Sequence, residues 1–377
     1  MREHRIEVEL QTAGRSFITK IAPDETTCTL RYNAPSTAYL TVKDSHPAVP
    51  ELLADGVRAA VWMVTVEDNA PVQTTRLLEG VVGDLSGEGP YGTVTIPVID
   101  DFAWFSQILG WQNPGAAITA QVDEYARYSG PSETRALAAI AANATRLGLP
   151  WTIAASAGRG TSGTTELRMH PLADRILPAL TADRLQLTIE RNASTDLWEV
   201  AVRAGTAYTR PLTPQSGVLA GWKWRRARPT MTRAVIGGAG QGEEREFALV
   251  INPTRETALQ RIIEGFDDSR MAEAGANLVP YGQATLADAA AKAGVEATLR
   301  ETSWFRFPTA YGIGTKVTIQ AGAMTAEDVI SEIGITHTAD AGFVVVPKVG
   351  LAVDDPQVRL TEFVGSLATS VRNLERR

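Results

Sequence analysis

Short segments in which apolar and polar residues alternate occupy most of the first 97 residues. Alternation is clear at residues 6–10, 27–32 and 38–42, and further strand patterns follow at 57–66, 77–82 and 93–96. Turn-forming residues such as Asn33, Pro71 and Gly87 separate these segments. Because successive side chains of a strand point to opposite faces, each segment can bury one face. About six or seven strands with short turns predict a closed or nearly closed barrel, or a sandwich.

The pattern becomes helical after residue 99. The spacing of Phe102, Phe105 and Ile108 predicts a helix over residues 100–109. Asp100 and Asp101 fall at its N-cap and first turn, where negative charge is favourable. Further helices are predicted at 118–128, 131–147 and 171–181, and strands at 151–153, 166–169, 185–189 and 197–202.

A second β-rich part is expected from about residue 211 to 350, with strands at 295–299, 316–319, 326–336 and 342–347. It contains a helical excursion near residues 253–294, made of a segment at 264–270 and a helix at 284–293 that Gly294 would end. Two β-rich parts of similar size indicate an internal duplication, although no repeated sequence period supports it.

The predicted fold class is therefore α+β and β-rich, with two β-barrel-like domains separated by an α+β insert and followed by a C-terminal helix. The expected boundaries are 1–105 for the N-terminal barrel-like domain, 106–210 for the insert, 211–350 for the second barrel-like domain and 351–377 for the helix.

The C-terminal helix carries an apolar seam. Its members are spaced alternately four and three residues apart: Leu360, Val364, Leu367, Val371 and Leu374. A heptad seam of this kind favours a short coiled coil or a docking helix for oligomerisation. It spans barely two heptads, so packing of the helix on its own domain is an equal alternative.

Residues 231–251 combine two apolar, β-branched runs with a glycine-rich loop between them, which predicts strand, loop, strand. The loop supplies six candidate interface residues: Gly237, Gly238, Gly240, Gly242, Glu243 and Arg245. A phosphate-binding loop would have lysine where Glu243 stands, and the glycine spacing does not match a dinucleotide fingerprint. A strand, not a helix, is expected to follow. We therefore interpret the glycines as serving positive φ, a bulge, or close approach to another chain.

One basic strip, residues 221–228, stands out in an acidic chain whose net charge is −7. As a strand it would place Trp222, Trp224 and Arg226 on one face, and Lys223, Arg225 and Ala227 on the other, solvated face. Cations beside aromatic rings can stack on bases or sugars. The isolated strip in an acidic chain favours instead an acidic partner protein or a neighbouring subunit.

Composition narrows the function classes further. The net charge argues against nucleic-acid sequence recognition. No apolar run approaches the roughly 18–20 residues that span a bilayer, and the N-terminus lacks the apolar core of a signal peptide, so synthesis in a cytoplasm is expected. The single cysteine, Cys28, and four scattered histidines give no metal-ligand pattern, and we expect no metal or cofactor.

The sequence carries no nucleophile signature, so the chain is not expected to be an enzyme. The neighbouring carboxylates Asp267/Asp268 and Asp354/Asp355 leave a glycan or peptidoglycan hydrolase as the alternative. Adjacent carboxylates rarely face each other across a substrate, and glycoside hydrolysis needs a separation of roughly 5–9.5 Å. A host-envelope-binding module is the other alternative, and it would use aromatic residues such as Trp111, Trp222 or Trp304.

The order of several segments resembles a known family. These are residues 98–104 after a β-rich start, 233–245, 264–270 and 312–319. In this order the chain, from its start to about residue 350, resembles hub-type minor tail proteins of actinobacterial siphophages, which are distantly similar to the baseplate hub proteins of contractile phage tails.

The resemblance implies a virion structural protein at the phage tail tip, made in the host cytoplasm. It implies barrels around the tail axis and a homotrimeric ring. The implied neighbours are a distal tail protein or the tail tube, a tape measure protein, and tail fibre or spike proteins. With an internal duplication, a trimer would present six similar barrels to a six-fold tail tube.

Overall fold

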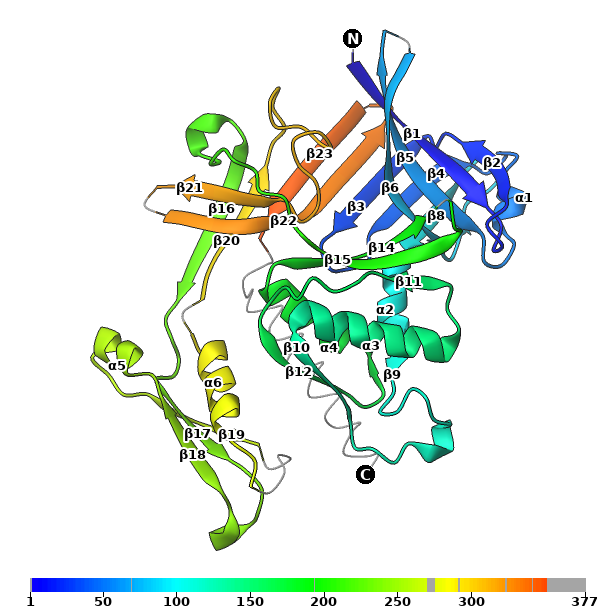
Figure 1. Cartoon of the computed structure of the whole chain (residues 1–377). Coiled ribbons are helices and arrows are strands. Elements are labelled where there is room, and N and C mark those ends of the chain that lie inside the picture. Colours follow the sequence, from blue (N-terminus) through cyan, green and yellow to red (C-terminus); the bar gives the residue numbers. More distant parts are fainter. Residues whose placement is uncertain are drawn as a thin grey trace. The chain divides into compact units, whose positions relative to one another are not determined.

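The computed structural model describes residues 2–68, 70–192, 194–269, 275–290, 292–322, 324–340 and 342–350. The predicted C-terminal helix lies outside this part of the chain. The described residues divide into two compact units (Figure 1). Unit 1 comprises Met1–Trp222 and Ala297–Gly350, and unit 2 comprises Lys223–Glu296. No helix among the described residues is long and apolar enough to cross a membrane.

One large sheet dominates unit 1. Its N-terminal strands are β1 (Arg2–Gln11), β2 (Phe17–Ile21), β3 (Glu25–Arg31), β4 (Thr37–Lys43), β5 (Arg58–Glu67), β6 (Ala70–Val82), β7 (Ser86–Gly87) and β8 (Thr93–Asp100). Its later strands are β16 (Leu219–Ala227), β20 (Lys292–Leu299), β21 (Lys316–Ala321), β22 (Met324–Thr338) and β23 (Gly342–Val349). The order is β16-β20-β23-β22-β3-β4-β8-β6-β5-β1-β2, with β21 on β22 and β7 on β8.

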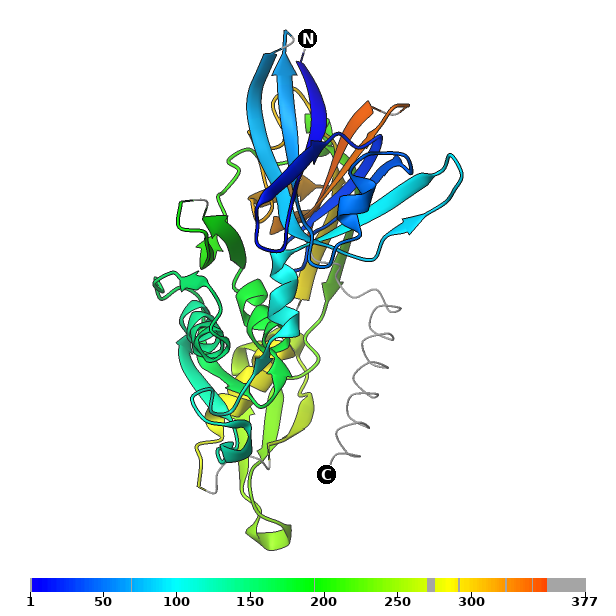
Figure 2. The ribbon, with the colours of Figure 1, turned by 90° about the vertical axis from the view of Figure 1, so that its right-hand side faces the viewer.

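The two β-rich stretches of the sequence meet in this sheet, because β22 pairs antiparallel with β3 and places Ile335 opposite Cys28. The strand β22 and its neighbours β3, β21 and β23 pair antiparallel, as do β1 to β8 with their neighbours in this sheet. The described strands form no closed barrel, so the two barrels expected from the sequence are not confirmed. In Figure 2, the hairpin of β5 and β6 rises beside β1, in agreement with their antiparallel registers.

The alternation read from the sequence is confirmed in the strands with one buried face. In β4, Ala38, Leu40 and Val42 are buried, whereas the residues between them are partly or fully exposed. β5 is buried along most of its length, as its long apolar run predicted. The short elements β2, β7 and α1 (Val49–Leu52) were not predicted, because their few residues carry no periodic signal.

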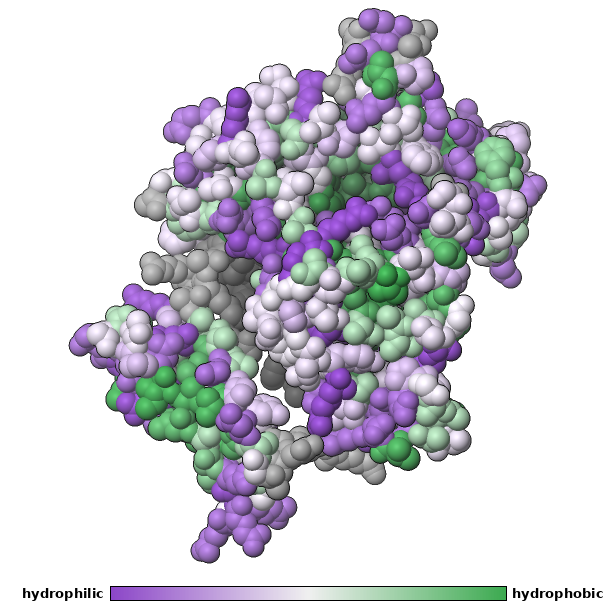
Figure 3. Space-filling model, in the orientation of Figure 1, coloured by the Kyte–Doolittle hydropathy of each residue, from purple (hydrophilic) through white to green (hydrophobic). Residues whose placement is uncertain are grey.

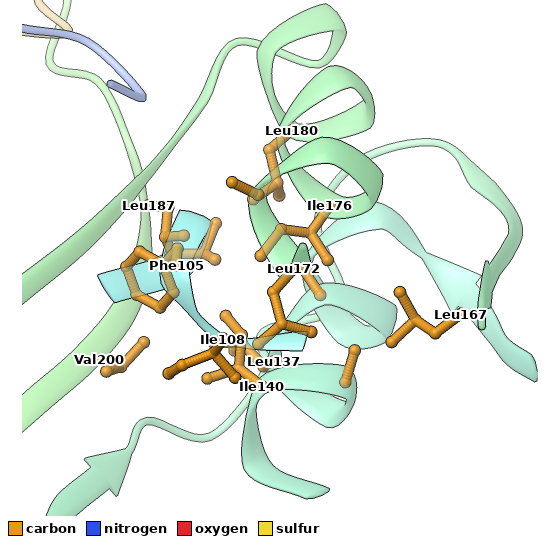
Figure 4. Packing of buried hydrophobic residues seen from close by; sticks show 14 of the residues in the cluster. Phe105, Ile108, Leu137, Ile140, Leu167, Leu172, Ile176, Leu180, Leu187 and Val200 are labelled. Carbon is orange, nitrogen blue, oxygen red and sulfur yellow. The ribbon is translucent and has the colours of Figure 1, made fainter. Parts of the chain in front are cut away.

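The α+β insert is also part of unit 1. After the 3-10 helix η1 (Asp101–Ala103) it contains α2 (Trp104–Gln107), β9 (Leu109–Gly110), η2 (Ile118–Ala120), β10 (Ala126–Pro131), α3 (Ser132–Leu147), β11 (Trp151–Ile153), β12 (Ser162–Leu167), β13 (His170–Pro171), α4 (Leu172–Ala182), β14 (Leu185–Asn192) and β15 (Leu197–Ala204). Helices α3 and α4 pack on a three-stranded sheet of order β11-β15-β14 around Phe105, Ile140 and Leu187 (Figure 4).

The predicted helix at 131–147 is confirmed as α3. Pro131 precedes its first turn, Glu133 lies in that turn, and Gly148 ends it with φ +61°. The predicted helix at 118–128 is wrong. Only η2 is helical there, and β10 begins at Ala126, because pairing with β12 places Ala126 opposite Leu167. Tertiary pairing outweighs local propensity at this segment.

Two buried polar residues join the large sheet to the insert. Asp101 lies in the first turn of η1, as predicted, and its carboxylate also pairs with Arg58 of β5 at 2.6 Å and accepts a hydrogen bond from Trp198 Nε1 of β15 at 2.6 Å. Asn33, read as a turn residue, has φ +50° and hydrogen-bonds to the backbone of Leu185 and Leu187 in β14 at 2.9 Å each. Both side chains satisfy polar groups that would otherwise be buried without partners.

Unit 2 is a small α+β unit. It contains β17 (Arg233–Gly237), η4 (Gly242–Glu244), β18 (Phe247–Ile251), α5 (Pro253–Leu259), β19 (Glu264–Asp268) and α6 (Val279–Asp288), and its sheet has the order β18-β17-β19. β17 pairs antiparallel with β18 and parallel with β19. Helix α6 packs on one face through Leu278 and Leu286, against Ala234 and Ile236.

Two helical predictions fail in unit 2. Residues 264–268 form strand β19, because pairing with β17 satisfies their backbone. The helix predicted at 284–293 is displaced, since α6 begins at Val279 with proline in its first turn and ends at Asp288, and β20 starts at Lys292. The alanine-rich stretch has helical propensity, but its last residues belong to β20 and pair within the large sheet.

Candidate functional site

The glycine-rich segment is a β-hairpin, as predicted. β17 and β18 pair in register, with Val235 opposite Leu249 and Gly237 opposite Phe247. The loop is closed by a hydrogen bond from the Gly238 backbone N–H to the Glu246 carbonyl at 2.8 Å. A strand therefore follows the loop. The described hairpin has no long helix whose N-terminus could receive a phosphate, since η4 has only three residues.

Two glycines of the loop are required by close approach. A Cβ atom on Gly237 would lie 2.8 Å from Cζ of both Arg245 and Phe266. Gly240 has φ +94°, and a Cβ there would meet the Glu244 carbonyl oxygen. Positive φ is found at Gly240, as predicted, and the groups that approach Gly237 and Gly240 belong to the same chain. Close approach of this loop to another chain stays a prediction. Gly242 also has positive φ, while Gly238 packs against Leu278.

Arg245 occupies the centre of this end of unit 2. Its guanidinium pairs with Asp268 at 2.5 Å and donates to the Gly237 carbonyl at 3.3 Å. It also lies 5.6 Å from the ring centroid of Phe247 and 5.4 Å from that of Phe266. Because Gly237 has no Cβ, the guanidinium can approach the backbone of β17 while it stays within about 6 Å of the centroids of two aromatic rings. Glu243, the other charged candidate in the loop, is exposed.

A hollow of about 530 Å³ lies beside this arginine, lined by Gly240, Gln241, Gly242 and Arg245. The positive charge next to the hollow is already matched by Asp268. An anionic ligand would have to displace that carboxylate, so the hollow does not have the character of a phosphate cradle.

Two further charged groups near the sheet of unit 2 have partners as well. Arg233 lies 2.5 Å from Glu256, and hydrogen bonding to Arg233 lowers the pKa of the Glu256 carboxyl. Asp267 accepts a hydrogen bond from the Thr285 hydroxyl at 2.5 Å. Asp267 and Asp268 therefore have separate structural partners. Asp354 and Asp355, the second carboxylate pair considered for a hydrolase, lie outside the described residues.

The face of the unit 2 sheet opposite α6 is apolar and open. Phe247, Leu249 and Ile251 project from β18, Phe266 projects from β19, and all four are exposed by 42% or more. Figure 3 shows a hydrophobic patch over this unit. Sequence reasoning missed this face, although residues 247–251 are all apolar and a strand of that kind offers apolar side chains to both of its faces.

The basic strip belongs to β16, the first strand along the sheet order. Trp222 and Trp224 are 41% and 60% exposed, and Lys223 between them is exposed too. Both faces of the strand are therefore accessible here, whereas the prediction gave it one solvated face. The side chains of Arg225 and Arg226 lie outside the described part of the structure. Trp222 and Lys223 also mark the boundary between units 1 and 2.

The remaining aromatic and histidine candidates are engaged within unit 1. Arg146 lies 4.2 Å above the half-buried ring of Trp111, and Arg210 lies 5.7 Å from that of Trp304. His170 Nε2 lies 2.9 Å from Arg175. Within the described ranges, no three His, Cys, Asp or Glu side chains are grouped so that they could hold a metal ion.

A family model described as Siphovirus ReqiPepy6 Gp37-like protein matches residues 21–350. Among solved structures, the chain is similar to the prophage tail protein gp18 from Listeria monocytogenes, with a TM-score of 0.55, 11% identity, and coverage of 97% of this chain and 99% of that chain. It is also similar to the 43 kDa tail protein of prophage MuSo2 from Shewanella oneidensis, with a TM-score of 0.52, 15% identity, and coverage of 91% and 97%.

A chain in a Francisella PdpA-VgrG complex has a TM-score of 0.50 and 9% identity, and the match covers 93% of this chain and 58% of that one. No curated protein matches the chain. At these identities the structural similarity concerns the fold. The family match covers most of the chain and confirms the resemblance to siphophage tail proteins, so the chain belongs to the siphovirus Gp37-like family and has the fold of phage tail proteins.

Proposed function

We propose that this phage tail protein is a hub component of the tail tip, and that three copies form a ring that joins the tail tube to the distal tip. The observation that carries the proposal is the end-to-end similarity to two prophage tail proteins, which leaves at most 3% of either of those chains unmatched. The family match over residues 21–350 supports the same class of protein.

The sheet of unit 1 supports a ring-forming role. In the described part of the chain, its order ends at β16 on one side and at β2 on the other. Edge strands offer unpaired backbone groups that a neighbouring chain can complete. We propose that assembly in the ring uses these edges, and that the β-rich residues 1–105 and 211–350 act there as two barrel-like modules.

The proposed neighbours are a distal tail protein or the tail tube, the tape measure protein, and fibre or spike proteins that contact the host. The exposed Trp222, Lys223 and Trp224 of β16 support an acidic protein partner at this strand. Tryptophan is enriched at protein interfaces and supplies contact area, and the Lys223 ammonium supplies charge complementary to an acidic partner.

The proposal is tested by the solution mass of the purified full chain, alone and mixed with its neighbouring tail proteins. We expect three times the 40.5 kDa of one copy, either alone or after mixing. The same samples are incubated with host cell wall, and we expect no release of fragments. A chain that stays monomeric in every mixture, or a monomer that degrades cell wall, would overturn the hub proposal.

A further inference from the structure

The open face of unit 2 is organised in cross-strand rows. Its central row is Leu249 of β18, Val235 of β17 and Phe266 of β19, since Val235 pairs with both neighbours. Phe247 and Ile251 extend the apolar surface along β18. Two ion pairs border it, Arg245 with Asp268 at one end and Arg233 with Glu256 near the other. The face is therefore a continuous apolar strip with neutralised charges at its ends.

The strip has the area of the largest apolar patch on a typical monomer, which is often functional, and is too small for a stable dimer. Phe247, Leu249, Ile251 and Phe266 are 60%, 51%, 42% and 56% exposed. At roughly 150–200 Å² for a large apolar side chain, they present roughly 300–400 Å², which is the size of a functional patch on a monomer. A stable interface between two proteins needs about 800 Å² on each side. An exposed area of this size is comparable to the apolar face of one amphipathic helix.

The opposite face of the same sheet is already covered by a helix. Helix α6 covers it, with Leu278 and Leu286 packed against Ala234 and Ile236. A second helix on the open face would complete a three-layer arrangement in which both faces of the sheet are buried.

The helix predicted from the sequence of residues 351–377 matches this face in size. Its predicted seam from Leu360 to Leu374 spans about 21 Å at 1.5 Å per residue. The five residues of β18 span about 17 Å, and three strands are about 10 Å wide, close to the width of one helix. The seam and the sheet face therefore agree in length, width and apolar character.

The chain path brings this segment to unit 2. Val349 of β23 pairs with Ala297 of β20, the residue that follows Glu296, where unit 2 ends. The two strands are antiparallel, so β20 leaves unit 2 and β23 returns towards the same boundary. Residues 351–359 can extend by up to about 30 Å before the seam begins. The same chain can thus deliver the helix to unit 2.

We infer that the C-terminal segment of each chain docks on the open face of its own unit 2, with the seam against Leu249, Val235 and Phe266. The docked seam also meets Phe247 and Ile251, and unit 2 becomes buried on both faces. This inference does not depend on the hub proposal, because the docking occurs within one chain.

The test places one cysteine on each surface of the full chain. Leu249→Cys marks the middle of β18, in the central row of the sheet face, and Leu367→Cys marks the middle of the seam, so the two come close whichever way the helix runs. The native Cys28 does not interfere, since burial raises its pKa to about 12 and keeps it a thiol. The matched control combines Leu249→Cys with Thr369→Cys, which lies about 200° around the helix from position 367.

Under mild oxidation, we expect the Leu249→Cys and Leu367→Cys pair to form a disulfide within one chain at least tenfold faster than the control pair. The rate is expected to be unchanged on tenfold dilution. Equal rates for the two pairs, or no disulfide, would overturn the inference. Disulfides between chains, formed more slowly on dilution, would overturn it in favour of a second copy as the occupant.

A second measurement does not rely on the disulfide. In the full chain carrying Leu249→Cys, a thiol-reactive dye is expected to label position 249 slowly. Adding Leu367→Asp, which places a charge in the seam, should raise the labelling rate at least tenfold. Adding Thr369→Asp instead should leave the rate unchanged. Fast labelling before any change in the seam would show that the face is open in the intact chain and would exclude docking.

Discussion

The Arg58 guanidinium lies 2.6 Å from the Asp101 carboxylate, and both side chains are almost fully buried. Asp101 also accepts a hydrogen bond from Trp198, so one carboxylate connects β5, η1 and β15. This contact fixes the large sheet and the insert of unit 1 against each other.

Replacement of this carboxylate by Asp101→Asn is expected to lower the free energy of unfolding by about 3–5 kcal/mol, because it leaves the Arg58 charge buried without a counter-ion. Urea unfolding measures the loss. The matched control is Glu166→Gln, which removes a half-exposed ion pair with Arg127 and should cost less than about 1 kcal/mol. Similar losses for the two variants would contradict the assigned role of Asp101.

Asn33 holds the edge of β14 with two backbone hydrogen bonds and combines them with a left-handed backbone. Asn33→Gly keeps the backbone and removes the bonds, so we expect a loss of about 2–3 kcal/mol. Asn33→Ala should lose about 1 kcal/mol more, since alanine also disfavours positive φ. Thermal or urea unfolding of the two variants gives the comparison. If Asn33→Ala is as stable as Asn33→Gly, strain at this turn is not part of the explanation.

Asp100 makes the free energy of unfolding depend on pH. Burial raises its pKa from 3.8 to about 6, although hydrogen bonds from Ser36 oppose the shift. Because the folded pKa is the higher one, the stabilisation is complete below pH 3.8 and is lost as the pH rises through about 6. Asp100→Asn should therefore gain about 2–3 kcal/mol relative to the native chain between pH 4 and pH 8. Urea unfolding of both proteins at pH 4 and pH 8 measures the difference between their free energies of unfolding. If this difference is the same at the two pH values, burial of the Asp100 carboxylate is not the cause.

The glycine loop of unit 2 provides a matched pair of substitutions. In Gly240→Ala, the new Cβ meets the Glu244 carbonyl oxygen at positive φ, and we expect a loss of about 2–3 kcal/mol. Gly242→Ala also has positive φ but nothing within 4 Å, so its loss should stay near 1 kcal/mol. Hydrogen exchange of residues 247–251 reports the opening of this hairpin. Equal exchange in the two variants would show that the close contact is unimportant.

The basic strip is tested by charge reversal. The double change Arg225→Glu and Arg226→Glu should weaken binding to an acidic tail partner at least tenfold, and the weakening should shrink as salt is added. Lys43→Glu with Arg261→Glu, at two exposed positions outside strands β16 and β2, changes the net charge equally and serves as the control. Isothermal titration with the partner measures both. An equal effect of the two double variants would point to net charge instead of a local contact.

Local periodicity made the strands of the first hundred residues predictable, because β3, β4 and β8 each bury one face. Helix α3 was predictable from Pro131, Glu133 and Gly148 at its ends. Pairing over long sequence distances was not predictable. The contact of β22 with β3 joins residues about three hundred positions apart, and no local pattern encodes it.

In the candidate site, too, the local features were predictable and the long-range contacts were not. The hairpin and its glycines were predicted, since loop chemistry is local. The partner of Arg245 was not, because Asp268 comes from β19, 23 residues later, and that segment has helical character in the sequence. The open apolar face emerges only when β18, β17 and β19 are placed side by side.

The neighbouring positions of β16 and β20 in the large sheet have a consequence for how this chain can change over generations. Unit 2 is inserted between these two strands, so its entry and exit are held about 5 Å apart by strand pairing. Such an insertion can be removed, enlarged or exchanged with only a tight turn needed to reconnect the ladder. The sequence of unit 2 can therefore be exchanged for another inserted domain while the strands of the large sheet keep their pairing.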